Sequence, residues 1–282
     1  MAYVNSISSY ISFVNESRNS DPKTILPEGA ENCGHGSHKN YFQGIIPYKT
    51  SDSSGNNIYK KYLVLGYQNT ISEEQIKKIL TNVNYNDKRD ESKNTASSRG
   101  RGIKNLMYHF GKHVTVYTEG VNINNIKYHT QYQWKVNEHI DHLIRLKNKK
   151  QKDEINLIAS NFINTTKRTY DENDIAPKII KIKNKIKRAC SDAEIDYPKT
   201  LIIILLRDKY QSTNDECKIN NILDDIMYNI FPKKYFDLDI NIYYLKEDNE
   251  SDIEDRELVI EEISKIDIVG KNYKQHCISF KV

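Results

Sequence analysis

The chain has 282 residues, of which 28% are charged and 38% hydrophobic, and Lys and Arg together exceed Asp and Glu by four. This length and composition allow one large or two modest hydrophobic cores and exclude disorder throughout the chain. The four cysteines lie far apart with no CxxC pair, and the longest apolar run, Leu201 to Leu206, is much shorter than the roughly 20 residues of a membrane helix, so a reduced, cytoplasmic protein without a membrane span is expected.

The first half of the chain is predicted to form helices and strands from its apolar spacing and its turn residues. In chain order, the predicted elements are a helix over 1–15, a loop over 20–40, strands over 41–48 and 57–67 joined by a turn, a helix over 73–80, a polar loop over 88–99, a helix after Arg101 that ends at Gly111, strands over 113–118 and 126–134, and a helix over 136–146. The two strands joined by a turn indicate a hairpin.

The second half alternates helix and strand, which predicts an α/β layer. Its predicted elements are helices over 154–163, 177–189, 217–231 and 257–266 and strands over 200–206, 236–245 and 277–282. The strand over 200–206 is continuously apolar, as expected for a central strand that is covered on both faces. The basic, polar stretch 145–152 is interpreted as the boundary between one domain over 1–148 and another over 149–282.

Two glycines, Gly100 and Gly102, stand immediately before the amphipathic helix that follows Arg101. Glycine lets a backbone approach a phosphate closely, and the unpaired amides at a helix start, together with the helix dipole, stabilise negative charge. Arg101 and Lys104 would add positive charge directly. The pattern predicts an anion site, although many helices simply begin after a glycine turn.

The stretch from Ser97 to Gly120 resembles the third motif of the GHKL superfamily, which includes gyrase, chaperone, histidine kinase, MutL and MORC ATPases. In that motif a mobile lid, a glycine pair, a helix and a strand of the form VTVxT follow one another. Here the order is a polar loop, Gly100 and Gly102, a helix to Phe110, and the strand that ends at Thr118. The resemblance covers roughly residues 1–135.

The resemblance implies a fold of the α/β class, an α+β sandwich. The domain over 1–148 would be GHKL-like, with helices on one face of a mixed sheet, and a C-terminal α/β domain would follow it. It also implies ATP and Mg²⁺ as cofactors. The residues that would bind the nucleotide are Asn32, Arg99, Gly100, Arg101, Gly102, Lys104 and Thr118.

Two upstream segments resemble the first and second motifs of the same superfamily. In the first motif a Glu activates the attacking water and an Asn four residues later helps to hold magnesium, which implies Glu28 as the catalytic residue and Asn32 as the metal ligand. On a helix, a spacing of four places both side chains on one face. The segment from Tyr62 to Glu74 resembles the second motif, but Gly66 stands where the family has the Asp that binds the adenine amino group.

Three functions are open at this point. The first is a diverged ATPase that acts as a nucleotide-dependent switch for the C-terminal domain or for a protein partner. The second is a non-hydrolysing scaffold of GHKL shape that binds protein or nucleic acid, the latter through the basic segment Lys178 to Arg188. The third is a metal-dependent hydrolase or nuclease whose ligands would be Cys33, His35, His38, His139 and His142.

Overall fold

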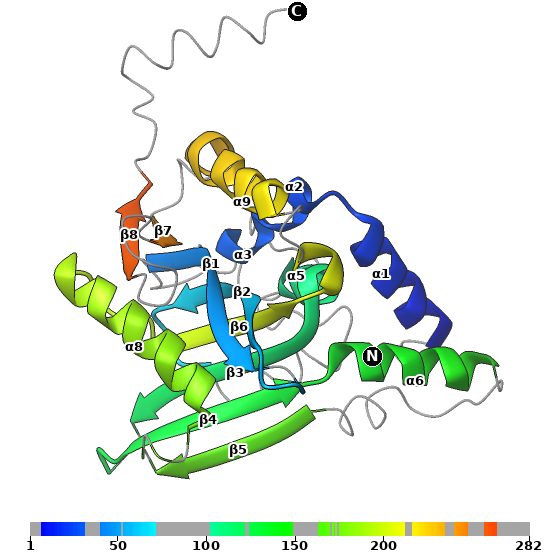
Figure 1. The fold of residues 1–282 in the computed structure, drawn as a ribbon, viewed down its shortest axis with the longest axis horizontal. Helices are drawn as coiled ribbons and strands as arrows, with labels where there is room; N and C mark the ends of the chain where they lie inside the picture. The colour runs from blue at the N-terminus through cyan, green and yellow to red at the C-terminus, as the bar shows by residue number, and fades with distance from the viewer. Residues whose placement is uncertain are drawn as a thin grey trace, which may run out of the picture.

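The computed structural model describes residues 7–31, 40–51, 53–71, 102–121, 124–148, 163–169, 171, 173, 175–211, 216–234, 240–247 and 257–263. In these parts of the chain, eight strands form one mixed sheet in the order β5-β4-β3-β6-β2-β1-β7-β8 (Figure 1). The strands are β1 (Asn40–Ser51), β2 (Asn57–Tyr67), β3 (Gly111–Val121), β4 (Lys127–Trp134), β5 (Ile163–Thr169), β6 (Thr200–Leu206), β7 (Asn241–Glu247) and β8 (Leu258–Glu262). Strands β1 and β7 pair in parallel, and the other neighbours pair antiparallel.

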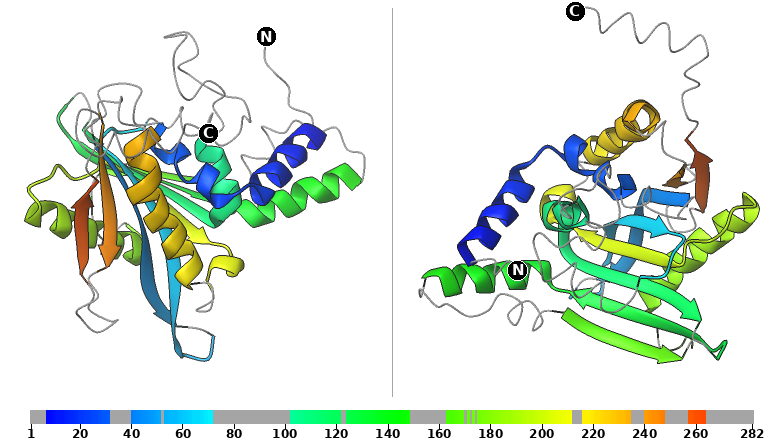
Figure 2. Two further views of the ribbon diagram at one scale, coloured as in Figure 1. Left: turned by 90° about the horizontal axis from the view of Figure 1, so that it is seen from above. Right: turned by 180° about the vertical axis from the view of Figure 1, so that it is seen from behind.

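Helices cover both faces of the sheet, so the molecule has three layers (Figure 2). One face carries α1 (Ile7–Asn19), α2 (Pro22–Ile25), α3 (Glu28–Glu31), α5 (Gly102–Phe110), α6 (Val136–Asn148), the 3-10 turn η2 (Asp208–Tyr210), α9 (Glu216–Asp225), the π-helical turn η4 (Ile226–Ile230) and α10 (Phe231–Lys234). The other face is covered by α8 (Pro177–Asp192).

The two cores follow from the alternation of side chains along the strands. In β6, Ile202 and Ile204 face the large core under α1 and α5, whereas Leu201 and Ile203 face the smaller core under α8. The prediction of a central strand covered on both faces is therefore confirmed, and so is the hairpin, whose turn contains Gly55 with a φ of 80°.

The predicted boundary after residue 148 does not separate two sheets. Strand β6, from the second half of the chain, lies between β2 and β3 of the first half, and β7 pairs with β1. The sheet of the first half is thus incomplete without strands from the second, because β2 and β3 have no direct pairing with each other in the described register.

Three local predictions are wrong. Residues 258–262 form strand β8 and not a helix, because Leu258 and Ile260 pack against the core under α8 while the strand pairs with β7. Ile163 begins strand β5, which pairs with β4, and does not end a helix. The region 20–40 contains two short helices, α2 and α3. In each case tertiary pairing or packing outweighs local propensity.

Other predictions concern residues outside those that the structure describes: the helix over 73–80, the loop over 88–99, the helix over 154–162 and the strand over 277–282. Where the chain is described, no helix combines the length and the apolar composition that crossing a membrane requires.

Candidate functional site

Four adjacent strands place polar and aromatic residues at one level of the sheet, on the face that carries α3 and α5. The register pairs Thr118 of β3 with Thr200 of β6, Thr200 with Tyr67 of β2, and Tyr67 with Tyr41 of β1. Val116, Ile202 and Leu65 are two residues away from Thr118, Thr200 and Tyr67 on the same strands, and all three belong to the large core. The paired residues Thr118, Thr200, Tyr67 and Tyr41 form a row that therefore projects to the face of the large core. This level lies at the end of β2, where the second GHKL-like segment begins its turn.

Helix α3 is attached to this row through Tyr67. The Tyr67 hydroxyl donates a hydrogen bond of 3.0 Å to the carbonyl oxygen of Gly29. Tyr41 lies beside it, with a ring centroid 5.5 Å from that of Tyr67, and a Cβ added to Gly29 would collide with the Tyr41 hydroxyl. Gly29 thus allows α3 to approach the sheet closely.

Glu28 is held against the first turns of α5. The side-chain amide of Asn105 donates to Glu28 Oε2 at 2.9 Å, and Asn105 Oδ1 accepts a bond of 2.8 Å from the hydroxyl of Ser17 in α1. These contacts join three helices and fix the orientation of the carboxylate. The residue that the resemblance implies as catalytic therefore lies beside the helix that the resemblance implies as phosphate-binding.

The loop after β2 is fastened to the ends of β3 and β6. The amide of Ile71 donates to Thr118 Oγ1 at 3.3 Å, and the Thr200 hydroxyl donates to the carbonyl of Asn69 at 2.5 Å. The hydroxyls of Thr118 and Thr200 are themselves 2.9 Å apart. Thr118, which the resemblance implies as nucleotide-binding, is thus part of a buried hydroxyl network at this end of the sheet.

Helix α5 begins at Gly102, as predicted from the glycine pair. Leu106, Met107 and Phe110 are buried on its inner face. The helix ends at Phe110 and β3 begins at Gly111, where a glycine is needed because an added Cβ would collide with the Met107 carbonyl. Lys104 is 2% exposed, so it is part of the interior and not a surface cation.

The structure therefore brings Glu28, Gly102 and Thr118 onto one face of the sheet, although they come from separate segments. Asn32, Arg99, Gly100 and Arg101 lie outside the described residues, and their implied roles stay predictions. Sequence reasoning did not select Tyr67, Asn105 or Thr200. The alternation of β2, with Leu63 and Leu65 in the large core, is the signal that would have selected Tyr67.

Gly66, which stands where the sequence resemblance would place an adenine-binding Asp, faces the opposite side of the sheet. A Cβ added there would lie 3.0 Å from Phe42 Cβ and 3.1 Å from the ring of Pro198. Phe42 belongs to the core under α8. A carboxylate at this position would thus be directed away from α3, and Tyr67 occupies the corresponding level on the α3 face.

Only two of the predicted metal ligands, His139 and His142, are among the described residues, and both lie in α6. His139 is buried between the rings of Tyr10 and Trp134, and Trp134 Nε1 donates to its Nδ1 at 3.3 Å. Burial lowers its pKa to about 4. Cys33, His35 and His38 lie outside the described residues, and within those residues no three His, Cys, Asp or Glu side chains form a cluster that could hold a metal.

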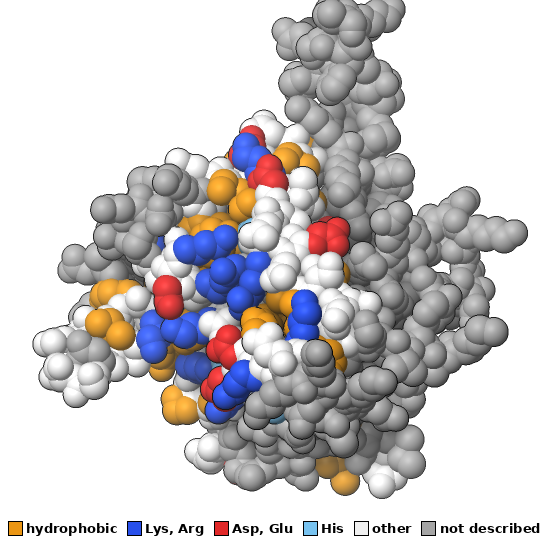
Figure 3. Space-filling view, turned by 90° about the vertical axis from the view of Figure 1, so that its right-hand side faces the viewer, with side chains coloured by type: hydrophobic (Ala, Val, Ile, Leu, Met, Phe, Trp, Pro, Cys, Tyr) orange, Lys and Arg blue, Asp and Glu red, His pale blue; other side chains and the backbone are white. Residues whose placement is uncertain are grey.

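Figure 3 shows a face of the molecule on which Lys and Arg side chains gather. A group of cations lies at the far end of α5. Arg207 Nη1 donates to the carbonyl oxygen of His109 at 3.1 Å, which satisfies a helix C-terminus with a positive charge. The pKa of Lys209 is lowered mainly by burial and secondly by the charges of Arg207 and Arg18. The pKa of Arg18 is also lowered, first by burial and then by the charge of Arg207. The ring of His109 lies within this group, with Nδ1 2.7 Å from the Ser17 carbonyl and Nε2 2.5 Å from the Tyr210 hydroxyl.

No protein-family model matches the sequence, and no curated protein matches it either. Among solved structures, the chain is similar to the N-terminal domain of a DNA repair protein, with 9% identity over 91% of this chain and 57% of that one, at a TM-score of 0.44. It is also similar to the ATPase and transducer domains of DNA topoisomerase II from Balamuthia mandrillaris, with 10% identity, coverages of 85% and 48%, and a TM-score of 0.38.

A third similar structure is the ATPase region of Saccharomyces cerevisiae topoisomerase II, with 13% identity, coverages of 84% and 47%, and a TM-score of 0.37. The chain spans about half the length of these solved structures. At these TM-scores the likeness assigns no residue a role.

Proposed function

We propose that the chain binds a nucleoside triphosphate where α3, the start of α5 and the ends of β2, β3 and β6 meet. The observation that carries the proposal is the convergence of three GHKL-like segments at this place, through the bonds of Tyr67 to Gly29 and of Asn105 to Glu28. ATP is the nucleotide that the resemblance implies, and Mg²⁺ would accompany its phosphates, with Asn32 as the implied ligand.

The phosphates would lie at the start of α5. The amides of a first helical turn have no partner within the helix, and their dipoles favour an anion. Gly102 carries no side chain that would keep a phosphate oxygen from these amides. In this arrangement Glu28 would accept the proton of the attacking water, with Asn105 holding the carboxylate in place.

Base recognition would be weak, because Gly66 has no side chain and its Cα faces Pro198 on the other side of the sheet. Affinity would then depend mainly on the phosphates, so ATP and GTP are expected to bind with dissociation constants within about threefold of each other. A carboxylate that accepts a hydrogen bond from adenine discriminates far more strongly, since the wrong base leaves it unpaired.

A nucleotide-dependent switch has a route through β3. Thr118 contacts the loop after β2, and the adjacent Glu119 forms an ion pair of 2.6 Å with Lys183 of α8 on the other face. A displacement of the end of β3 on nucleotide binding would therefore move both faces of the sheet, which is how the site would act on α8 or on a partner.

A scaffold that binds no nucleotide is the second candidate. The packing of Tyr41 against Tyr67 and against Phe231, with a centroid distance of 6.2 Å for the second pair, favours it, because aromatic rings fill space beside Gly29. Calorimetric titration separates the two candidates. The wild type is titrated with ATP, GTP and inorganic tripolyphosphate, each with and without Mg²⁺, and the proposal predicts binding of all three in the presence of Mg²⁺.

Three variants assign the binding to this site. Gly102→Val should weaken ATP binding at least tenfold, and Gly102→Ala, with a smaller side chain, should weaken it less. Glu28→Gln should bind ATP with an affinity within about threefold of the wild type. It should release phosphate at least about a hundredfold more slowly, which is in the range of general-base catalysis. The matched control is Glu16→Gln, on the exposed side of α1. Absence of binding in the wild type would leave the scaffold, and unchanged binding by Gly102→Val would place the nucleotide elsewhere.

A further inference from the structure

Helix α8 carries a row of cations along one side. Lys178, Lys181, Lys185 and Arg188 are spaced by three, four and three residues, which places them on one side of a helix over a length of about 15 Å. The inner side of the same helix is apolar, with Ile179, Ile182 and Ile186 buried against the sheet. The row thus lies along the flank of α8, with Lys181 and Arg188 exposed and Lys178 and Lys185 half-buried.

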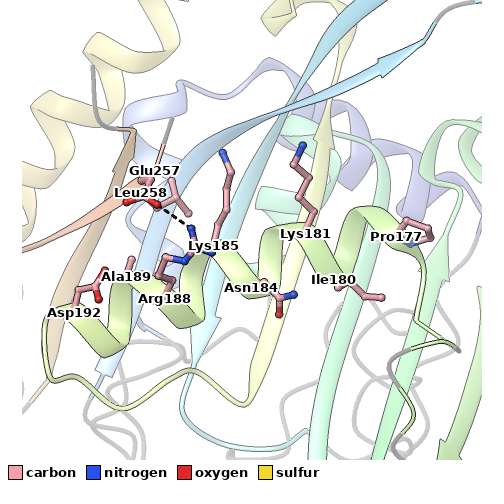
Figure 4. Close-up of a pocket in the computed structure, with 10 residues that line it drawn as sticks. All are labelled: Pro177, Ile180, Lys181, Asn184, Lys185, Arg188, Ala189, Asp192, Glu257 and Leu258. Atoms are coloured by element: carbon pink, nitrogen blue, oxygen red, sulfur yellow. Dashed lines mark hydrogen bonds and ion pairs between the residues drawn. The ribbon is translucent and has the colours of Figure 1, made fainter. Parts of the chain in front are cut away.

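The row borders a hollow of about 500 Å³ between α8 and the start of β8. In Figure 4 the side chains of Lys181 and Lys185 extend from the helix in the same direction, and Arg188 is turned toward Glu257, with which it forms an ion pair of 2.8 Å. Asn184, which also lines the hollow, adds an amide that can donate hydrogen bonds.

The hairpin of β1 and β2 extends the positive surface. Lys178 Nζ lies 5.9 Å from the ring centroid of Tyr62, and Lys181 Nζ lies 5.7 Å from that of Tyr48. The pKa of Lys178 is lowered first by burial and then by the charge of Lys60, so Lys60 is a further cation close to the row. An anion bound here would relieve this repulsion between like charges.

We propose that this surface, formed by Lys178, Lys181, Lys185 and Arg188 with the hollow beside them, binds the phosphate backbone of single-stranded nucleic acid. A row of about 15 Å exceeds the size of one phosphate group and matches an extended polyanion. Lys181, Lys185 and Arg188 line the hollow, and the half-buried ring of Tyr48 lies 5.7 Å from Lys181 Nζ. An unpaired base would stack on this ring beside the bound phosphates, which favours a single strand over a duplex.

An anionic membrane is the less suitable partner. Membrane-bound helices combine cations with exposed apolar residues. Within the described residues, the large hydrophobic side chains that are exposed belong to elements other than α8, and they are Tyr59, Val121, Ile126, Ile144, Tyr228 and Val259. The site lies on the sheet face opposite to α3 and α5, so nucleic-acid binding can be tested without added nucleotide and can fail separately from the proposed nucleotide site.

Fluorescence anisotropy of a labelled 15-nucleotide oligothymidylate tests the proposal, without added nucleotide and over a series of salt concentrations. Lys181→Gln/Lys185→Gln should weaken binding about tenfold at low salt. It should also reduce the slope of log K against log salt by about 1.4, because two phosphate contacts are lost. The matched control Arg145→Gln/Lys147→Gln removes the same charge from the exposed side of α6, on the other face, and should change the affinity less than twofold.

Thermal unfolding shows whether the variants keep the fold, which is expected because Lys181 is exposed and Lys185 half-buried. The proposal is overturned if the wild type does not bind the oligonucleotide, or if both double variants weaken binding equally. Tighter binding to a duplex of the same length, to anionic phosphatidylserine vesicles or to polyglutamate would also overturn it.

Discussion

Replacing Glu119 with alanine is expected to lower the free energy of unfolding by about 3 kcal/mol, because it removes the carboxylate that faces a buried ammonium group. The side chain of Lys183 is 4% exposed and that of Glu119 28%. Their ion pair of 2.6 Å is supported by Tyr117, whose hydroxyl donates to Glu119 Oε1 at 2.8 Å. The partial exposure of Glu119 places the expected value at the lower end of the range for buried pairs.

Urea unfolding of Glu119→Ala measures the effect, and two further variants calibrate it. Glu257→Ala removes a carboxylate from the pair with Arg188, in which the side chains are 60% and 71% exposed, and should cost less than about 1 kcal/mol. The double variant Glu119→Gln/Lys183→Met removes both charges and should recover most of the loss. Equal effects of Glu119→Ala and Glu257→Ala would contradict a buried ion pair between β3 and α8.

Lowering the pH from 7 to 5 is expected to destabilise the fold through histidines that are buried in the neutral form. Burial lowers the pKa values of His109, His113 and His139 to about 4, below the ordinary value of about 6.5. The unfolded chain therefore binds more protons than the folded chain between these values. Their contribution to stability is fully present above pH 6.5, falls as the pH decreases, and reaches its lower limit below pH 4.

Near pH 5, the protonation of His139 gives the free energy of unfolding a slope of about 1.2 kcal/mol per pH unit. His113, which is half-buried, should contribute a smaller slope. Urea unfolding at pH 7, 6 and 5 measures the slope. His139→Gln should reduce it by about that amount. If His139→Gln does not fold, His113→Gln gives the same test with a smaller change. A free energy of unfolding that is constant from pH 7 to 5 would contradict the neutral, buried state of these rings.

The elements that the sequence predicts correctly are those whose local pattern and tertiary role agree. The run from Leu201 to Leu206 is apolar on both sides because β6 is covered on both faces, and the helix before Gly111 has its apolar residues at helical spacing because α5 lies on the sheet. The hairpin is predicted from its turn residues and from the two strands that flank them. In each of these cases neighbours in sequence are sufficient to specify the structure.

The elements that could not be predicted depend on partners that are distant in sequence. Leu258 to Glu262 contains good helix formers, but its pairing with β7 makes it a strand. The insertion of β6 between β2 and β3 joins the two halves of the chain, and no local pattern at residues 145–152 could indicate it. The same limit applies to the site. The resemblance to GHKL motifs selected Glu28 and Thr118, whereas Tyr67 and Asn105 are selected only by their contacts with Gly29 and Glu28.

The two proposed sites lie on opposite faces of one sheet and are connected at adjacent residues. Thr118 is directed toward the loop after β2, and Glu119 binds Lys183 of α8, the helix that carries the proposed nucleic-acid surface. Nucleotide and nucleic acid would therefore influence each other's affinity if the end of β3 moves on binding.

Hydrogen–deuterium exchange with and without Mg-ATP shows whether a nucleotide's phosphates bind at the start of α5. Saturating Mg-ATP is expected to slow amide exchange in the first turn, from Gly102 to Asn105, and this protection should be lost in Gly102→Val. Protection that spares this turn, or that persists in the variant, would contradict the claim.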